Sequence, residues 1–112
     1  ERDTAKRPVQ GRIGAEYADL VILADEDPRG EQPMAILRDI LAGMPEHSDA
    51  TGKAMLIPDR KTAIRKAFTE ARSGDTVLLL GKGHETSIEY ASGELEWSEA
   101  AVARALLREL KA

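Results

Sequence analysis

The loop Gly81–Glu85 follows the apolar run Val77–Leu80 and gathers several chemically active side chains. Its two glycines allow backbone conformations and close approaches that other residues cannot adopt. Lys82 supplies a cation, His84 a titratable imidazole and Glu85 a carboxylate. The same residues fit equally well a solvated turn at the end of a strand. The loop is not a Walker A phosphate loop, because the frame ending in Gly-Lys-Ser/Thr is absent.

A second loop, Asp25–Arg29, follows the apolar run Leu20–Leu23 and combines three carboxylates with one guanidinium. Clustered carboxylates suit a hard cation. Pro28 and Arg29 instead favour a rigid turn that presents an arginine fork, which pairs with a carboxylate through two hydrogen bonds. A solvated acidic loop with local ion pairs is the third interpretation, and composition alone slightly favours it.

The segment Arg2–Arg7 alternates positive and negative side chains at the start of an expected helix. Helix N-termini and basic side chains both attract phosphate, although an ordinary exposed helix start explains the same charges. We interpret His47 as a surface-loop residue and Trp97 as a packing residue. The absence of cysteine excludes disulfides, thiolate nucleophiles and cysteine-based zinc sites, and we expect no metal site.

The overall composition fits one soluble domain of 112 residues with an aliphatic core, since 42% of residues are hydrophobic and only 4% aromatic. A net charge of −4 gives no general attraction to nucleic acid. The apolar runs are too short to cross a membrane, and the N-terminus lacks the apolar stretch of a signal peptide. We therefore expect a cytoplasmic protein, and the charged start without a methionine indicates a fragment.

The hydrophobic pattern predicts strands that alternate with helices. Expected helices span 5–17, 33–42, 59–72 and 98–111; expected strands span 20–23, 54–57 and 76–80, and a hairpin pairs 86–90 with 94–97. This order predicts an α/β domain: a Rossmann-like, three-layer arrangement with a mainly parallel sheet and a C-terminal hairpin. Ligands of such sheets meet the loops at the carboxyl ends of the strands. Because the order begins with a helix, we expect a preceding strand outside this chain.

Several local features refine this expectation. Asp59 and Ser98 are candidate helix N-caps. Gly14 is a candidate for close helix packing. The residues expected on buried helical faces are Val9, Ile13 and Ala18 in the first helix and Val102, Leu106, Leu107 and Leu110 in the last.

The charged motifs, taken in order, resemble the C-terminal domain of the Mur ligases over nearly the whole chain. The matching pieces are Arg2-Asp3 with Lys6-Arg7-Pro8, Asp27-Pro28-Arg29, Glu31 with Pro33, Asp39-Ile40 with Gly43, Asp59-Arg60 with Ala63-Ile64, and Gly81–Glu85. Each piece alone is weak evidence, but their order together is specific.

The resemblance is strongest to those Mur ligases that add a diamino acid, meso-diaminopimelate or lysine, to UDP-N-acetylmuramoyl-L-Ala-D-Glu in peptidoglycan biosynthesis. It implies that ATP phosphorylates a carboxylate of the nucleotide-linked peptide, which the incoming amino group then attacks. ATP and Mg²⁺ would be bound mainly by a central domain and the uridine nucleotide by an N-terminal domain. Both domains would lie outside residues 1–112, so this amino-acid-binding domain should be inactive alone.

The resemblance also implies roles for individual residues. Arg29, in the motif with Asp27 and Pro28, would grip the distal carboxylate of diaminopimelate. Gly81 and Glu85 would contact the same distal end, with the Glu85 carboxylate facing an ammonium. The residues implied near the reacting groups are Arg2, Asp3 and Lys6, and Lys82 and His84 are possible further members of the site.

One residue departs from the family pattern, which has Asn where this chain has Asp27. An Asp side chain cannot donate the hydrogen bonds of an amide, and it adds negative charge near a substrate carboxylate. Lysine, ornithine or another diamino acid therefore stays open beside diaminopimelate.

Two alternatives to this function remain. One is a Mur ligase-like amide ligase with another substrate, as in folylpolyglutamate and cyanophycin synthetases, although the loops fit these less well. The other is a non-catalytic α/β binding module. A P-loop in the sequence upstream of this chain would favour the ligase.

Overall fold

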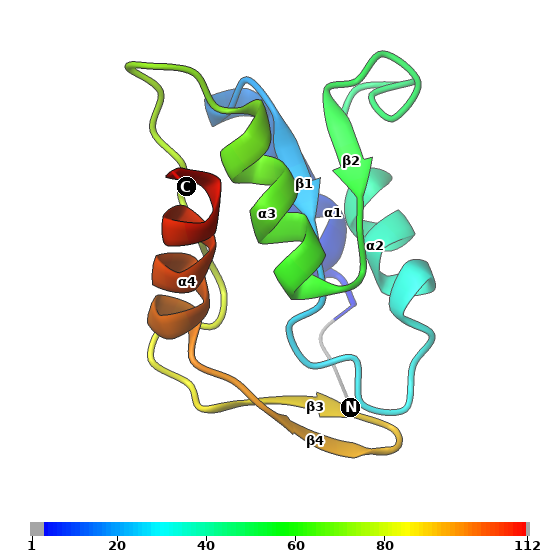
Figure 1. Cartoon of the computed structure of the whole chain (residues 1–112). Helices are drawn as coiled ribbons and strands as arrows, with labels where there is room; N and C mark the ends of the chain where they lie inside the picture. Colours follow the sequence, from blue (N-terminus) through cyan, green and yellow to red (C-terminus); the bar gives the residue numbers. More distant parts are fainter. Residues whose placement is uncertain (1–3, 112) are drawn as a thin grey trace.

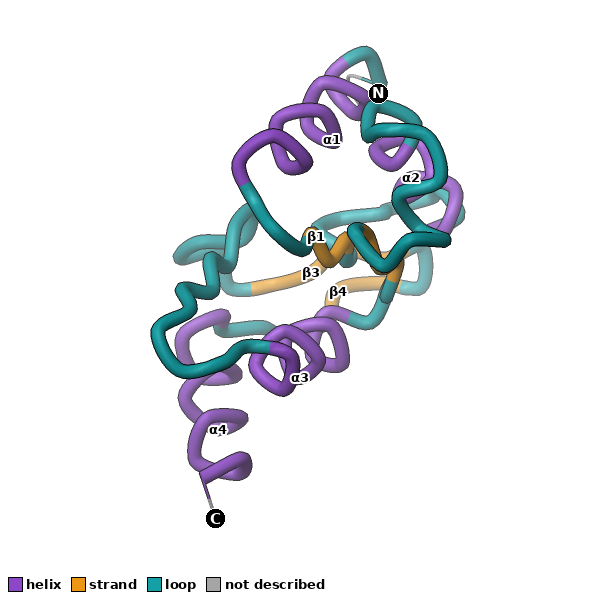
Figure 2. Tube along the Cα trace, turned by 90° about the horizontal axis from the view of Figure 1, so that it is seen from above, coloured by secondary structure: helices purple, strands orange, loops and turns teal. Residues whose placement is uncertain are grey.

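The computed structural model describes residues 4–111, which form three layers (Figure 1, Figure 2). A parallel pair of strands, β1 (Val21–Leu23) and β2 (Ala54–Leu56), lies in the middle. Helices α1 (Lys6–Tyr17) and α2 (Pro33–Leu41) cover one face of this pair. Helices α3 (Arg60–Glu70) and α4 (Glu99–Lys111) lie on the other face. The expected Rossmann-like α/β fold is confirmed.

An antiparallel hairpin, β3 (Ser87–Tyr90) and β4 (Gly93–Glu96), is separate from the parallel pair. It lies across the end of the molecule toward which β1 and β2 point (Figure 1). The loops that leave the parallel layer therefore run toward the hairpin. The expected C-terminal hairpin is confirmed, and it closes the edge at which ligands of α/β folds bind.

Both expected helix caps are present. The Asp59 carboxylate accepts a hydrogen bond from the backbone N–H of Thr62 at 3.0 Å, at the start of α3. The Ser98 hydroxyl accepts one from the N–H of Ala101 at 3.3 Å, at the start of α4. Each cap satisfies an N–H that has no partner within its helix.

The most buried apolar cluster joins α3, the hairpin and α4. Its members are Ile64, Ile88, Trp97 and Leu106, each at most 8% exposed. Trp97 is thus a packing residue, as predicted. Leu107 and Leu110 are 48% and 45% exposed, so the prediction that they line the buried side of α4 is wrong. Helix α4 buries only the narrower stripe that reaches this cluster.

Glycines bring α1 and α2 into backbone contact. A Cβ atom added to Gly11 would lie 1.8 Å from the carbonyl oxygen of Ile40. One added to Gly43 would lie 1.7 Å from the carbonyl oxygen of Pro8. At Gly14 the nearest atoms would be at an ordinary 3.6 Å, so the close packing occurs at other glycines than the one predicted.

The apolar face predicted for the first helix is not buried. Val9 and Ile13 are 43% and 46% exposed, whereas α1 buries Arg7 and Gly11. The close backbone contact at Gly11 turns that side of α1 toward α2 and leaves the branched side chains at the surface.

Residues 76–80 form no strand, contrary to the prediction. Among the described residues, no backbone–backbone hydrogen bond joins this segment to a neighbouring strand. Its side chains alternate as expected of a strand: Leu79 packs on the core cluster, while Leu78 and Leu80 are 72% and 71% exposed. The segment therefore has the apolar pattern of a strand, but within residues 4–111 it lacks the backbone hydrogen bonds to a neighbouring strand that would make it one.

Candidate functional site

The two charged loops found in the sequence lie against each other. Gly81 has a φ angle of 106°, a conformation that residues with a Cβ rarely adopt. A Cβ at Gly81 would lie 2.2 Å from a carboxylate oxygen of Glu26. The backbone conformation therefore favours glycine at this position, while the Glu26 side chain could move aside for a larger residue.

Lys82 connects the two loops through its buried ammonium group. Its Nζ lies 2.9 Å from Oδ1 of Asp27 and 2.7 Å from Oε1 of Glu85, and its side chain is 1% exposed. Burial alone would lower the pKa of Lys82, but the hydrogen bonds and charges of the two carboxylates outweigh burial and raise it. Lys82 is thus a fixed positive charge that holds both carboxylates in place.

Asp27 also ties its loop to the hairpin. Its Oδ1 accepts a hydrogen bond from the N–H of Glu89 at 2.9 Å. The N–H of Arg29 donates to the carbonyl of Glu89 at 2.8 Å, so two bonds fix this loop to β3. Burial would raise the pKa of Asp27, but the hydrogen bonds from Lys82 and Glu89 hold it below its usual value.

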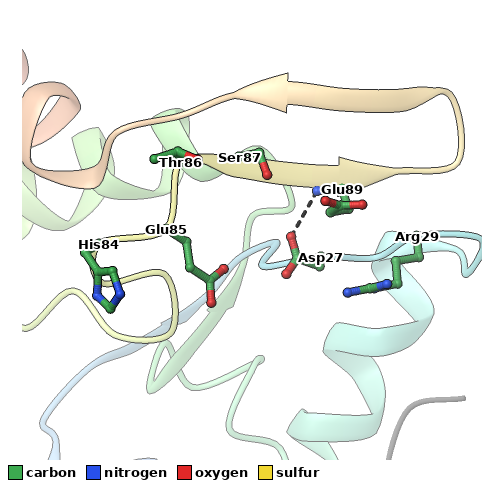
Figure 3. A pocket seen from close by; sticks show the side chains of 7 residues that line it. All are labelled: Asp27, Arg29, His84, Glu85, Thr86, Ser87 and Glu89. Atoms are coloured by element: carbon green, nitrogen blue, oxygen red, sulfur yellow. Dashed lines mark hydrogen bonds between the residues drawn. The ribbon is translucent and has the colours of Figure 1, made fainter.

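Arg29 has a φ angle of 54°, which is unusual for a residue other than glycine. Such conformations persist where surrounding bonds impose them, and they are frequent at functional sites. The bond from Arg29 to β3 is one such restraint. It directs an exposed guanidinium toward the space between the loops (Figure 3).

A pocket of about 520 Å³ lies between the loops and the hairpin. It is lined by Asp27, Arg29, His84, Glu85, Thr86, Ser87 and Glu89. Figure 3 shows Glu85 and Arg29 pointing toward Asp27 from opposite sides, with His84 at the far end. Carboxylates and a guanidinium that converge in this way can bind a molecule carrying both ammonium and carboxylate groups.

Four of the predicted site residues line this pocket: Asp27, Arg29, Glu85 and His84. Three other predicted site residues lie next to the pocket without lining it. Pro28 and Lys82 are fully buried, and Gly81 packs on the loop that contains Glu26. His84 lines the pocket, but its position there does not assign it a role, so its membership of the site stays a prediction.

Lys6 is not part of this pocket. It lines a second hollow of about 310 Å³ between α1, α2 and the other side of the Asp25–Pro28 segment. Asp27 lines both hollows, so the two share one carboxylate. Arg2 and Asp3 lie outside the described residues, and their predicted roles near the reacting groups are not tested by the structure.

Three lining residues escaped the sequence analysis: Thr86, Ser87 and Glu89. The period of the predicted hairpin strand could have indicated two of them, because Ser87 and Glu89 are two residues apart and share one face. Glu89 lies opposite Glu94 in the hairpin, and this neighbouring carboxylate raises the pKa of Glu89.

Another motif residue, Arg7, has a structural role. Its buried guanidinium pairs with Glu31 at 2.7 Å and with Asp39 at 2.9 Å, which joins α1 to the loop before α2 and to α2 itself. Three separate motif pieces of the sequence therefore meet in one ion-pair network, away from the pocket.

Within residues 4–111, no three His, Cys, Asp or Glu side chains are arranged to hold a metal ion. The acidic Asp25–Asp27 segment instead turns its carboxylates to different partners. Asp25 accepts a hydrogen bond from the Tyr90 hydroxyl at 2.9 Å, and Asp27 pairs with Lys82. None of the helices described by the structure has the length and apolar composition required to cross a bilayer.

Comparison with known proteins gives one matching family, described as "Mur ligase, glutamate ligase domain", over residues 1–83. The chain is 55% identical over 98% of its length to a UDP-N-acetylmuramyl-tripeptide synthetase of a Roseiflexus species, and 53% identical over 96% to that of Treponema denticola. It is 44% identical over 97% of its length to the UDP-N-acetylmuramoyl-L-alanyl-D-glutamate–2,6-diaminopimelate ligase of Geobacillus kaustophilus.

A solved structure of a diaminopimelate ligase of the same name also matches, with a TM-score of 0.88 and 28% sequence identity. The match covers 100% of this chain and 22% of that one. The chain likewise spans 22%, 20% and 22% of the three relatives named above.

Proposed function

This chain belongs to the Mur ligase family, and we propose that it is the C-terminal, amino-acid-binding domain of a cytoplasmic ligase of peptidoglycan biosynthesis. The proposed ligase joins a diamino acid to UDP-N-acetylmuramoyl-L-Ala-D-Glu. The observation that carries this proposal is the pocket in which Glu85 and Arg29 point toward Asp27 from two different loops.

The pocket residues supply complementary charges for the distal end of a diamino acid. Glu85 is half-exposed, so one side of its carboxylate can meet a substrate ammonium while the other meets Lys82. The exposed Arg29 guanidinium can pair with a substrate carboxylate through two parallel hydrogen bonds. Neither side chain is placed as a nucleophile, so the role proposed for this chain is to bind and orient the amino acid.

The charge balance of the site bears on which diamino acid binds. The carboxylates of Asp27, Glu85 and Glu89 exceed the cations of Arg29 and Lys82 by one formal charge. The single distal ammonium of lysine or ornithine would neutralise that excess. The distal end of diaminopimelate adds no net charge, but its carboxylate gives Arg29 a partner. The amino-acid screen described below therefore includes diaminopimelate as well as lysine and ornithine.

ATP and Mg²⁺, which the ligation needs, do not fit the residues of this chain. The sequence has no Walker A frame, and the described residues have no carboxylate cluster arranged for a cation. We therefore assign both groups to a central domain of the longer protein. Phosphorylation of the dipeptide carboxylate would take place there, with this domain closing against it.

An amino-acid screen of the complete protein tests the proposal. With ATP and UDP-N-acetylmuramoyl-L-Ala-D-Glu, we expect ligation of at least one of meso-diaminopimelate, lysine and ornithine, and none by the 112-residue chain alone. Arg29→Ala should impair diaminopimelate use by a few kcal/mol, on the order expected for a desolvated charge pair, and leave lysine use nearly unchanged. A complete protein that ligates none of the three amino acids would contradict the proposed function.

A further inference from the structure

A single arginine of α3 contacts the base of both site loops. Arg60 donates from one terminal nitrogen to the carbonyl of Asp25 at 3.1 Å and from the other to the carbonyl of Leu80 at 2.8 Å. Asp25 opens the first loop, and Leu80 directly precedes Gly81 of the second. The two carbonyls are thereby held on one rigid, planar group.

The guanidinium is itself fixed from behind by Glu99, the first residue of α4. Its Nε donates to Oε1 of Glu99 at 2.9 Å and its second terminal nitrogen to Oε2 at 2.6 Å. The indole N–H of Trp97 donates to the same Oε1 at 3.0 Å. Both charged side chains are 7% exposed, and these bonds lower the pKa of Glu99 although burial alone would raise it.

We propose that Arg60 is a positioning residue, which with Glu99 fixes the distance between the two loops and so sets the spacing of Arg29 and Glu85 across the pocket. This inference rests on the proposed function, since it concerns how the binding groups of the same pocket are held at a fixed spacing. It adds a role for two residues that do not line the pocket.

The geometry explains why the contact has to come from an arginine. Lys82 links the loops near the pocket mainly through the side-chain carboxylates of Asp27 and Glu85, and its contact with the backbone carbonyl of Glu26 is long, at 3.5 Å. Arg60 links their backbones, so its loss would let each loop shift as a whole. A lysine at position 60 would keep the charge, but its single ammonium cannot reproduce the planar fork that reaches two carbonyls and a carboxylate.

Steady-state kinetics of the complete ligase test this role with Arg60→Lys. We expect the KM for the diamino acid to rise by on the order of tenfold or more, because small misplacements of binding groups have effects of that size. The KM values for ATP and for the nucleotide-linked dipeptide should stay unchanged. The matched control is Arg65→Lys, since Arg65 pairs with Glu109 and joins the same two helices at the exposed surface.

An amino-acid KM that is unchanged in Arg60→Lys, measured well below its unfolding temperature, would overturn the proposal and leave Arg60 a stabilising residue only. Equal increases in all three KM values would also overturn it. If Arg60→Lys does not fold, Glu99→Gln replaces it, because the amide keeps the shape of the carboxylate and loses its charge.

Hydrogen exchange of the complete protein, read by mass spectrometry, separates this inference from the proposed function. In Arg60→Lys, peptides that contain residues 25–29 and 81–85 should exchange faster together, while peptides from α1 and α2 keep the wild-type rate. This result would support the clamp even if no ligase activity were found. Unchanged exchange in both loops would refute the clamp even in an active ligase.

Discussion

Lys82 and Arg60 are both buried cations that connect separate parts of the chain, but their surroundings differ. The carboxylates around Lys82 are partly accessible, with side-chain exposures of 16% for Asp27 and 54% for Glu85. The carboxylate of Glu99, which holds Arg60, is only 7% exposed. The Lys82 network is therefore open to the pocket, while the Arg60 network is closed.

This difference separates two uses of a buried charge. In the open network a ligand can share a carboxylate with the protein cation, so the ion pairs form part of a binding surface. In the closed network every polar atom already has a protein partner, and the charge serves only to hold backbone segments in place. Substitutions in the two networks should therefore affect stability and binding in different proportions.

The largest effect on stability is expected when the closed network is broken. Glu99→Ala leaves the Arg60 guanidinium buried without its counter-charge, which should lower the free energy of unfolding by about 3–5 kcal/mol. Urea unfolding of the chain, followed by far-UV circular dichroism, measures it. The exposed Arg65–Glu109 pair is the control, and Glu109→Ala should cost about 1 kcal/mol or less. Similar losses in the two variants would contradict the distinction between closed and exposed pairs.

A smaller loss is expected in the open network. Lys82→Met keeps most of the buried apolar stem but removes the partner of Asp27 and Glu85, whose accessible carboxylates can recover some hydration. We expect a loss of about 1–3 kcal/mol in the same unfolding experiment. A loss as large as that of Glu99→Ala would show that the Lys82 network is as closed as the other.

Acid titration compares the networks through their carboxylates. The pKa values of Glu99 and Asp27 are lowered in the folded protein, so the unfolded chain binds protons more readily. Their stabilisation is present above the ordinary carboxylate pKa of about 4 and is lost as the pH falls through the lower folded values. Glu99→Gln should therefore flatten the decrease in unfolding free energy below about pH 4. An unchanged acid slope in this variant would contradict the cause assigned to the shift.

The pKa of Asp25 is shifted in the opposite direction to those of Glu99 and Asp27, so its effect on stability at low pH is also opposite. Burial raises the pKa of Asp25, so its charged form costs folding free energy, and the loss of this cost on protonation partly offsets the acid destabilisation. Asp25→Asn should accordingly steepen the acid decrease relative to the wild type.

The smallest effect on stability should come with a clear effect on binding. Glu85→Gln alters a half-exposed carboxylate, so unfolding should change by less than about 1 kcal/mol. In the complete protein, the proposed function predicts that the amino-acid KM nevertheless increases, because the charge assigned to the substrate ammonium is lost. A stability loss without a change in KM would remove Glu85 from the proposed binding surface.

Local signals in the sequence predicted those parts of the fold that depend on neighbouring residues. Asp59 and Ser98 mark helix starts because a short polar side chain satisfies the N–H groups of the first turn. Ala91 and Ser92 separate two strand-like runs and form the turn of the observed hairpin, and Gly93 begins β4. Such features need no information about distant parts of the chain.

Features that depend on distant partners were predicted less well. The run 76–80 has the side-chain alternation of a strand, but strand formation also needs a partner backbone, which sequence pattern does not report. Arg60 and Glu99 are separated by 39 residues, and nothing in their local sequence pairs them. The pocket loops were identified from their residue types, whereas the contributions of Ser87 and Glu89 required the hairpin to be placed against them.

The left-handed backbone of Arg29 sets stability against recognition at a single position. Glycine adopts this conformation without steric cost, so Arg29→Gly would relieve strain while it deletes the guanidinium. Selection of random variants for thermal resistance alone would therefore tend to enrich glycine at position 29. If Arg29 binds the amino acid as proposed, selection for ligase activity would retain arginine at this position.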